Sequence, residues 1–263
     1  MSLREFGQLE LDYLKEVLDS GTLTCLDGKM TKRFEAAFAE MIGTKYAEAM
    51  CTGMCLMHSA LLAFGVGAGD EVLCDPMVAF GALATRYCNA VPVFVDIKPV
   101  TMNMDPDKIE AQITERTKAL IVTHMWGLPA EMDRIMEVCR RHGIRVLEDC
   151  AHAILASYKG KKVGSWGDVG FFSFQMSKQM GLGDGAMGTT DDEEMKRRLA
   201  LMGGAPTFGS VAHGIHYNYR ITELVSAVGL AQLQRIHGYI AQAQKNAKLV
   251  DEAVKDFPFI VVQ

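Results

Sequence analysis

Residues 169–188, VGFFSFQMSKQMGLGDGAMG, place one lysine between an apolar run and a glycine-rich loop. The aromatic and β-branched residues of 169–174 predict a strand. The glycines that follow permit turns that other side chains resist: Gly181, Gly183 and Gly185. Lys178 therefore follows a strand and precedes a turn. A partly desolvated amine in such a place loses its proton more readily and can form a Schiff base with an aldehyde or ketone. The alternative is an ordinary surface lysine in a turn.

Length and composition restrict the class of protein. The 263 residues, 49% of them hydrophobic, suffice for one large domain, or for one domain and part of another. This composition excludes a disordered or fibrous protein. The formal charge is 27 minus 32, or −5, and the basic residues are scattered, so we expect no nucleic-acid partner.

The cysteines and the apolar runs indicate the compartment. The seven cysteines are odd in number, lie mostly inside apolar segments and follow no signal peptide, which is typical of a reducing cytoplasm. No apolar run approaches the ~18 residues that a membrane helix needs. We therefore expect a soluble, cytoplasmic chain without disulfides or a membrane partner.

Apolar strands alternate with amphipathic helices along most of the chain. We expect strands over residues 71–74, 91–95, 119–124, 144–148 and 169–174, and helices over 4–20, 32–41, 54–64, 80–89, 106–112, 132–142, 191–202 and 222–246. Residues 203–214 read as a glycine-rich loop, and residues 251–263 as a little helix and an apolar, strand-like tail. This alternation predicts an α/β fold with three layers, a mostly parallel sheet covered by helices on both faces.

A ligand site is expected beyond the carboxyl ends of the parallel strands. Four segments fall there: 75–80, 124–127, 149–152 and the stretch around Lys178, of which the first two are expected to form the walls. The glycine-rich sequence GVGAGD, residues 65–70, ends a helix and leads into a strand, the reverse of a dinucleotide fingerprint. We interpret it as a helix-terminating turn.

Asp149 closes the strand-like sequence IRVLED. A carboxylate at this edge commonly caps the next helix or pairs with a nearby base. The more specific hypothesis is that Asp149 faces a pyridinium nitrogen, keeps the ring protonated and so lets a cofactor accept electrons from a carbanion. Because Asp149 and Lys178 end two different expected strands, one cofactor can bridge them.

Other residues supply what such a cofactor needs. The backbone N–H groups of Gly53 and Met54 lie in the first turn of an expected helix, where an anion is favoured, and Ser173 can add a hydroxyl. Phe80 follows a turn at the same edge of the sheet and can stack on a ring, or can be a core phenylalanine. His152 titrates near neutral pH, or is a satisfied core histidine.

Together these residues resemble the DegT/DnrJ sugar aminotransferase family of fold-type I pyridoxal-phosphate enzymes. The resemblance covers residues 9–241 and rests on several motifs in a fixed order: TGMCLMHSALLAFGVGAGDEVL, DPMVAFGA, VFVDI with MNMDP, HMWGLPAEMD, VLEDCAHA, VGSWGDVGFFSFQMSKQMGLGDG and YNYRITELVSAVGLAQL. It implies the large domain of the aspartate-aminotransferase-like fold, with pyridoxal 5'-phosphate as cofactor and no metal site.

The resemblance also implies roles. Lys178 would hold the cofactor as a Schiff base and shuttle a proton, Asp149 would pair with the pyridine nitrogen, and Phe80 would stack on the ring. His152 would lie near the ring hydroxyl. Asn218, in YNYR, matches a residue that reaches the phosphate of the other subunit's cofactor, so a homodimer with a shared active site is expected.

Gly53, Met54 and Ser173 would hold the phosphate. Met54 stands where the family usually has threonine or serine, so its backbone N–H survives but a hydroxyl contact is lost. A second departure is at the end of the chain, since family members continue into a small C-terminal domain. We expect an N-terminal helical arm over residues 1–35, a large cofactor-binding domain over 36–246, and the start of a truncated small domain over 247–263.

The function expected from this resemblance is transfer of an amino group from glutamate or glutamine to a keto carbon of a nucleotide-linked sugar or a cyclitol. EDCAHA suggests the cyclitol and aminohydroxybenzoate branch. Relatives that act as dehydratases carry histidine in place of the lysine and match poorly because Lys178 is present. A lyase or dehydratase of the same fold, and a cofactor-binding scaffold without turnover, stay open as alternatives.

Overall fold

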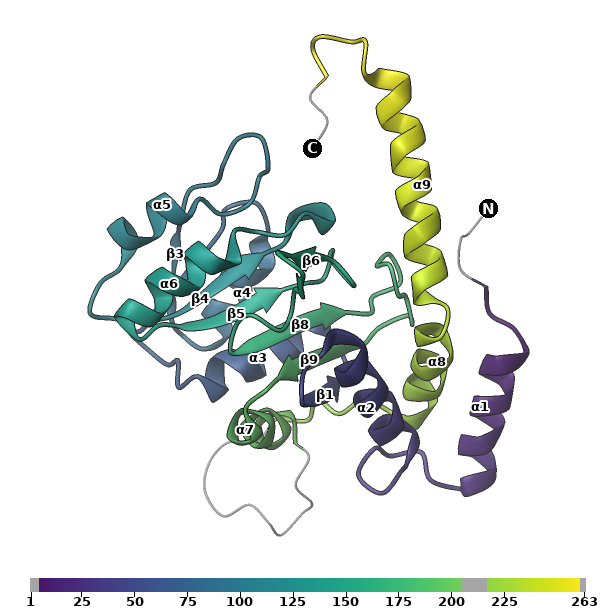
Figure 1. The fold of residues 1–263 in the computed structure, drawn as a ribbon. Helices are drawn as coiled ribbons and strands as arrows, with labels where there is room; N and C mark the ends of the chain where they lie inside the picture. The colour runs from purple at the N-terminus through teal and green to yellow at the C-terminus, as the bar shows by residue number, and fades with distance from the viewer. Residues whose placement is uncertain (1–4, 205–216, 261–263) are drawn as a thin grey trace.

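A seven-stranded sheet forms the centre of the computed structural model, which describes residues 5–204 and 217–260 (Figure 1). From one edge to the other the strands are β3 (Val91–Phe94), β2 (Glu71–Cys74), β4 (Thr117–Thr123), β5 (Arg145–Asp149), β8 (Val169–Ser173), β9 (Ala186–Thr190) and β1 (Tyr46–Met50). The pairs from β3 to β8 are parallel, and the pairs β8–β9 and β9–β1 are antiparallel. The expected mostly parallel sheet is confirmed.

The parallel strands form where the sequence is continuously apolar. In β4 and β5, Leu120 lies opposite Val146 and Ile121 opposite Leu147, and all four side chains are almost completely buried. Strands buried on both faces need apolar residues at every position, which is why the sequence predicts these elements to within about two residues.

The antiparallel end of the sheet was not expected. β1 reads YAEAM and β9 reads AMGTT, and the two pair from Tyr46 with Thr190 to Met50 with Ala186. Alanine, glutamate and glycine are poor strand formers. These strands therefore depend on the pairing of β1 with β9 and of β9 with β8, and on the helices that cover them.

One face of the sheet is covered by α3 (Gly53–Ala63), α4 (Ala79–Tyr87) and α7 (Glu193–Gly203). α3 is apolar on most of its surface, and seven of its eleven residues are buried. Residues 65–70 form the turn between α3 and β2, as expected, with positive φ at Gly65 and Gly69. This turn leaves the N-terminus of α3 at the carboxyl edge of the sheet.

The other face is covered in two halves. α6 (Met132–His142) and α5 (Pro106–Ile109) pack on the parallel half, and the exposed 3-10 turn η1 (Glu110–Gln112) follows α5. α2 (Met30–Ile42) and α8 (Glu223–Leu233) pack on the antiparallel half, where Phe34, Phe38, Phe172 and Phe174 meet at ring-centroid separations of 5.0 to 6.1 Å. β6 (Ser157–Tyr158) and β7 (Lys161–Lys162) form a separate hairpin, and η2 (Met125–Gly127) follows β4.

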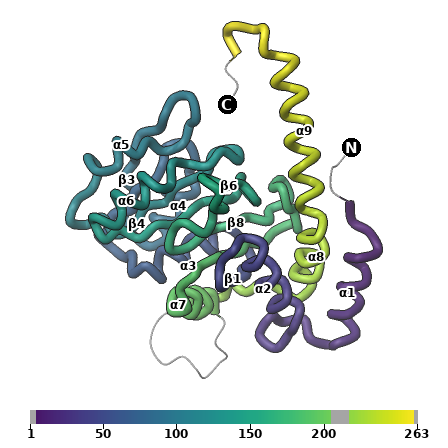
Figure 2. The backbone as a smooth tube through the Cα atoms, viewed as in Figure 1, coloured from purple at the N-terminus to yellow at the C-terminus, as the bar shows by residue number. Residues whose placement is uncertain are grey.

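The last part of the chain differs from the expected single helix over 222–246. α8 ends at Leu233, and α9 (Ile236–Val254) begins after a break at Gln234 and Arg235. Arg235 bonds Glu10 of α1 (Gln8–Ser20), which packs on α8. α9 then projects away from the sheet (Figure 2). None of the helices in the described part of the chain is long and apolar enough to cross a membrane.

Three further sequence expectations concern the tail, the loop over residues 203–214 and the domain boundaries. The described residues of the tail form no strand, since residues 255–260 are turns and coil, and residues 261–263 lie outside the described part. Residues 205–214 of the expected glycine-rich loop also lie outside it. The proposed boundaries at residues 35 and 246 fall inside α2 and α9, and the division into domains stays a proposal.

Candidate active site

A cavity of about 320 Å³ opens at the carboxyl ends of β5 and β8, beside the N-terminus of α3. Seven of the eight residues singled out in the sequence line it: Gly53, Met54, Phe80, Asp149, His152, Ser173 and Lys178. They come from four separate segments of the chain. The sheet edge expected to hold a ligand is therefore where the structure brings these residues together.

Lys178 lies in the loop that leaves β8. Its backbone N–H donates to the carbonyl of Gln175 (2.8 Å). The loop turns back on itself because Met176 N–H donates to the carbonyl of Gly183 (2.8 Å), and Gly183 and Gly185 have φ of 94° and 141°. Only glycine adopts such conformations readily. The glycines therefore hold the lysine at the mouth of the cavity.

Asp149 is the last residue of β5 and is 3% exposed. Its Oδ1 accepts a hydrogen bond from the backbone N–H of Ala151 (3.0 Å). Burial raises the pKa of the Asp149 carboxyl to about 6, against the lowering effects of the Ala151 N–H and of the positive charge of Lys178. A further cation beside this carboxylate would favour its ionised form.

The first turn of α3 faces the same cavity. Thr52 caps the helix, and its Oγ1 accepts from the N–H of Cys55 (3.3 Å). A Cβ at Gly53 would lie 2.8 Å from Cζ of Phe171 and 3.6 Å from Oγ of Ser173. A side chain cannot fit there, so glycine is what lets the first turn of α3 lie against Phe171 and beside the serine hydroxyl. Such a turn favours an anion.

Phe80 is not a core phenylalanine and His152 is not a satisfied core histidine, the alternatives that the sequence left open. Phe80 is 52% exposed although it is a large apolar side chain. Nδ1 of His152 is buried and has no hydrogen-bond partner within the described residues. Burial, and then the charge of Lys178, lower the pKa of His152. Both side chains are available to a ligand in the cavity.

Asn218 is not part of this group. It is exposed and lies outside the cavity, on the segment before α8. Its expected contact with a second subunit stays a proposal.

The expected walls are only partly as predicted. The segment 75–80 contributes Val78 and Phe80. His124, in contrast, is fully buried among protein groups. Trp126 instead lines a smaller cavity of about 270 Å³ with His152 and Lys178. It has φ of 48° and is 60% exposed, an uncommon conformation for a bulky residue. That positive φ had no signal in the sequence.

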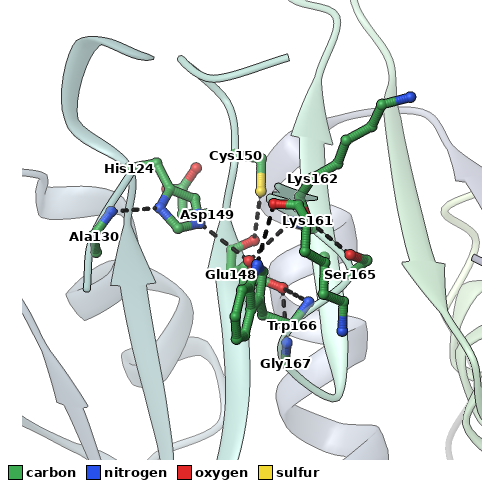
Figure 3. Close-up of polar contacts among 12 residues, drawn as sticks. His124, Ala130, Glu148, Asp149, Cys150, Lys161, Lys162, Ser165, Trp166 and Gly167 are labelled. Carbon is green, nitrogen blue, oxygen red and sulfur yellow. Dashed lines mark hydrogen bonds and ion pairs between the residues drawn. The ribbon is translucent and has the colours of Figure 1, made fainter. Parts of the chain in front are cut away.

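A second polar cluster is centred on Glu148, next to Asp149 on β5 (Figure 3). Glu148 Oε1 accepts from the N–H groups of Trp166 and Gly167 (both 2.7 Å), and Oε2 accepts from Gly164 N–H (2.8 Å) and bonds His124 Nε2 (3.2 Å). Nδ1 of His124 accepts from the N–H of Ala130 (3.1 Å).

His124, Glu148 and Cys150 offer ligand atoms within 4.8 Å of one another, a spacing that a metal ion could use. Both ring nitrogens of His124 and both oxygens of Glu148 are already engaged by protein groups. We therefore interpret the cluster as a structural lock between β4, β5 and the loop over residues 164–167.

Comparison with known proteins agrees with this geometry. A model of the DegT/DnrJ/EryC1/StrS aminotransferase family matches residues 5–263. The chain belongs to this family. The GDP-perosamine synthase of Caulobacter vibrioides is 40% identical over 240 residues, which cover 90% of this chain and 64% of that protein.

Two solved structures have the same fold. The aminotransferase from Psychrobacter cryohalolentis superposes with a TM-score of 0.89 at 34% identity, covering 98% of this chain and 69% of that one. NtdA from Bacillus subtilis, solved with bound cofactor PMP, gives 0.80 at 28% identity, covering 86% and 52%. The chain thus spans about two thirds or less of the length of each of these three relatives.

The residues around the cavity fit the cofactor expected for this family. Pyridoxal phosphate needs an anion-binding turn for its phosphate, a carboxylate for its ring nitrogen and an amine that can reach its aldehyde. Gly53 and Ser173 lie close together at the first turn of α3, Asp149 presents a buried carboxylate, and Nδ1 of His152 is unpartnered within the described residues. Lys178 lines the same cavity.

Proposed function

We propose that this chain is a pyridoxal-phosphate-dependent aminotransferase that moves an amino group from glutamate or glutamine to the keto carbon of a nucleotide-linked sugar or a cyclitol. The observation that carries the proposal is that Lys178 and Asp149, from the ends of β8 and β5, line one cavity. Membership of the aminotransferase family supports the reaction class.

When bound, pyridoxal phosphate supplies an electron-withdrawing ring that stabilises negative charge on the carbon beside the transferred nitrogen. Asp149 contributes a carboxylate at the ring nitrogen, where a cation lowers the cost of keeping this carboxyl ionised. Burial raises the pKa of the Asp149 carboxyl, and a protonated ring nitrogen beside it would offset that rise by favouring the ionised form. This is how the residue would set the electronics of the cofactor.

Lys178 supplies the amine. Its place on a loop held by backbone hydrogen bonds keeps the amine at the cavity mouth, where it can first bind an aldehyde and then, once released, carry a proton between two carbon atoms. The two tasks use the same nitrogen at different times. A side chain on four flexible carbons can do both.

The remaining residues would bind and orient. The N–H groups of Gly53 and Met54 and the hydroxyl of Ser173 would hold the phosphate. Phe80 would cover the ring from solvent, and His152 would lie beside the ring hydroxyl. Trp126, exposed next to Lys178, offers an aromatic surface on which a sugar ring can pack.

The relative named GDP-perosamine synthase supports a nucleotide-linked keto sugar as acceptor. We further propose a cytoplasmic homodimer in which Asn218 reaches the phosphate bound by the partner. The exposure of Asn218 and its position outside its own cavity agree with such a role.

The test is Lys178→Ala with added pyridoxal phosphate. We expect loss of the visible absorption of the lysine-bound cofactor and loss of amino transfer from glutamate to a nucleotide-linked keto sugar, by about 10⁴-fold or more because proton transfer and covalent binding disappear together. Lys15→Ala, which changes an exposed lysine on α1, is the control. Retention of both signals in Lys178→Ala would contradict the proposal.

A further inference from the structure

Two cysteines flank the turn that faces the cavity. Cys51 follows β1, and Cys55 is the third residue of α3. Their Sγ atoms are 3.7 Å apart. Both residues are partly exposed, whereas four of the other five cysteines of the chain are buried. A close, accessible pair of thiols is the arrangement that oxidises first.

The surroundings of Cys55 favour a thiolate. Its sulfur accepts hydrogen bonds from the thiol of Cys51 and from Oγ1 of Thr52 (3.1 Å), and it lies in the first turn of a helix, where negative charge is stabilised. The bond from Cys51, and then that from Thr52, lower the pKa of Cys55 to about 6 despite burial. The same bond raises the pKa of Cys51.

We propose that Cys51 and Cys55 are a peroxide-sensitive thiol pair, and that their disulfide weakens cofactor binding at the neighbouring phosphate turn. The second half of this proposal rests on the proposed function. The first half concerns the thiols alone.

The oxidant is hydrogen peroxide. The Cys55 thiolate attacks one peroxide oxygen, the O–O bond breaks, and the departing hydroxide takes a proton to leave as water. Cys55 is now a sulfenic acid. The Cys51 sulfur then attacks the Cys55 sulfur, the S–O bond breaks, and the hydroxide combines with the Cys51 proton as a second water. Two thiols are oxidised and one peroxide is reduced.

The bond changes the turn between the two sulfurs. The separation of the Cys51 and Cys55 Sγ atoms must shorten from 3.7 Å to about 2.0 Å when the disulfide forms. Thr52 loses the sulfur to which it donates, and the segment that closes is the one carrying the N–H groups of Gly53 and Met54. Because these groups must point at one anion together, a shift of the turn disturbs phosphate binding.

The first experiment treats the whole chain with hydrogen peroxide without cofactor, blocks the remaining thiols with iodoacetamide and maps peptides by mass. We expect a peptide with a Cys51–Cys55 disulfide, whose two cysteines take up iodoacetamide only after dithiothreitol. At the same peroxide concentration the buried cysteines should stay reduced and take up iodoacetamide only after the protein is unfolded. Free thiols at both positions after treatment would overturn the proposal.

Variants distinguish Cys55, the thiol that attacks peroxide, from Cys51, the thiol that resolves the sulfenic acid. Cys51→Ser removes the resolving thiol, so Cys55 is expected to stop at a sulfenic acid that dimedone traps. Cys55→Ser is expected to leave Cys51 unoxidised at the same peroxide concentration. Cys25→Ser changes a partly exposed cysteine elsewhere and is the matched control, expected to leave the linked peptide unchanged. A linked peptide that vanishes in the control would contradict the assignment.

The second experiment measures pyridoxal phosphate binding by fluorescence before oxidation, after oxidation and after dithiothreitol. We expect roughly tenfold weaker binding to the oxidised protein, or about 1.4 kcal/mol, with recovery on reduction and no change in Cys51→Ser. Equal affinity of the oxidised and reduced forms would overturn the effect on the cofactor. Failure of the reduced protein to bind would instead contradict the proposed function, while the peptide masses would still decide the disulfide.

Discussion

Two neighbouring carboxylates at the end of β5 have opposite surroundings. Glu148 faces the side of the sheet covered by α6 and accepts hydrogen bonds from three backbone N–H groups and a histidine. Asp149 faces the cavity and accepts one, from Ala151. Both are almost fully buried. Successive residues of a strand point to opposite faces, so one strand supplies an acid held by protein donors and an acid that lines the cavity.

The difference shows that burial alone does not tell whether a charged group stabilises the fold or awaits a ligand. A buried carboxylate whose lone pairs are filled by protein donors stabilises the fold. One with few donors is costly in the empty protein and is retained where a ligand supplies the missing partner. His124 connects the two, since its ring bonds Glu148 and its backbone N–H donates to the carbonyl of Asp149 (3.0 Å).

The largest expected effect is that of Glu148→Gln. An amide cannot accept at both ends, so its NH₂ group would face backbone donors that have lost their acceptor. We expect the free energy of unfolding to fall by about 3–5 kcal/mol, measured by urea denaturation. A loss below about 1 kcal/mol, the range of an ordinary hydrogen bond, would show that the lock contributes little.

Asp149→Asn, in contrast, should raise the free energy of unfolding of the protein without cofactor. Burial raises the pKa of this carboxyl in the folded protein to about 6, above its ordinary value of 3.8, so at neutral pH the folded protein must hold a carboxylate that it disfavours. We expect the variant to be about 1–3 kcal/mol more stable at pH 7. We also expect it to bind cofactor better than it turns over, with kcat lower by roughly 10²-fold.

The pH dependence of stability tests the direction of the Asp149 pKa shift independently. Below about pH 4 the carboxyl is protonated in both states, and its contribution to stability is fully present. Between about pH 4 and 6 only the unfolded state ionises, so that contribution is lost as the pH rises through the folded pKa. The advantage of Asp149→Asn should grow over this range and level off above it. A constant difference from pH 4 to 8 would contradict the pKa shift.

The smallest expected effect is that of Ser165→Ala. Its hydroxyl donates to the carbonyl of Lys162 (2.7 Å) within the loop that Glu148 holds, without touching the carboxylate. We expect a loss of about 0.5–1 kcal/mol in the same urea measurement. A loss equal to that of Glu148→Gln would mean that the loop as a whole, and not the carboxylate, determines the stability.

The parallel half of the sheet could be predicted because each strand has its own apolar signal. The strand over 71–74 and the helix over 132–142 agree residue by residue with β2 and α6. The residues that meet at the cavity could also be named, because the carboxyl ends of parallel strands share one edge. Lys178 and Asp149 needed no more than this rule and the chemistry of their side chains.

What the sequence did not reveal depends on partners distant in the chain. β1 and β9 become strands by pairing with each other, and the break at Arg235 coincides with a bond to Glu10, 225 residues away. The lock around Glu148 uses backbone N–H groups, which every residue except proline carries. Gly164 and Gly167 were the available hint, since a Cβ at either would lie 2.5 to 2.7 Å from a neighbour.

The projection of α9 has an energetic consequence. Of its 19 residues only Ile236 is buried, so the helix beyond its first turn buries almost no apolar surface of the described chain. Segments with so few buried contacts open with little free energy. The cooperative unit that melts as a whole should therefore end near α8, and α9 should fray independently while the sheet and its cavity stay intact.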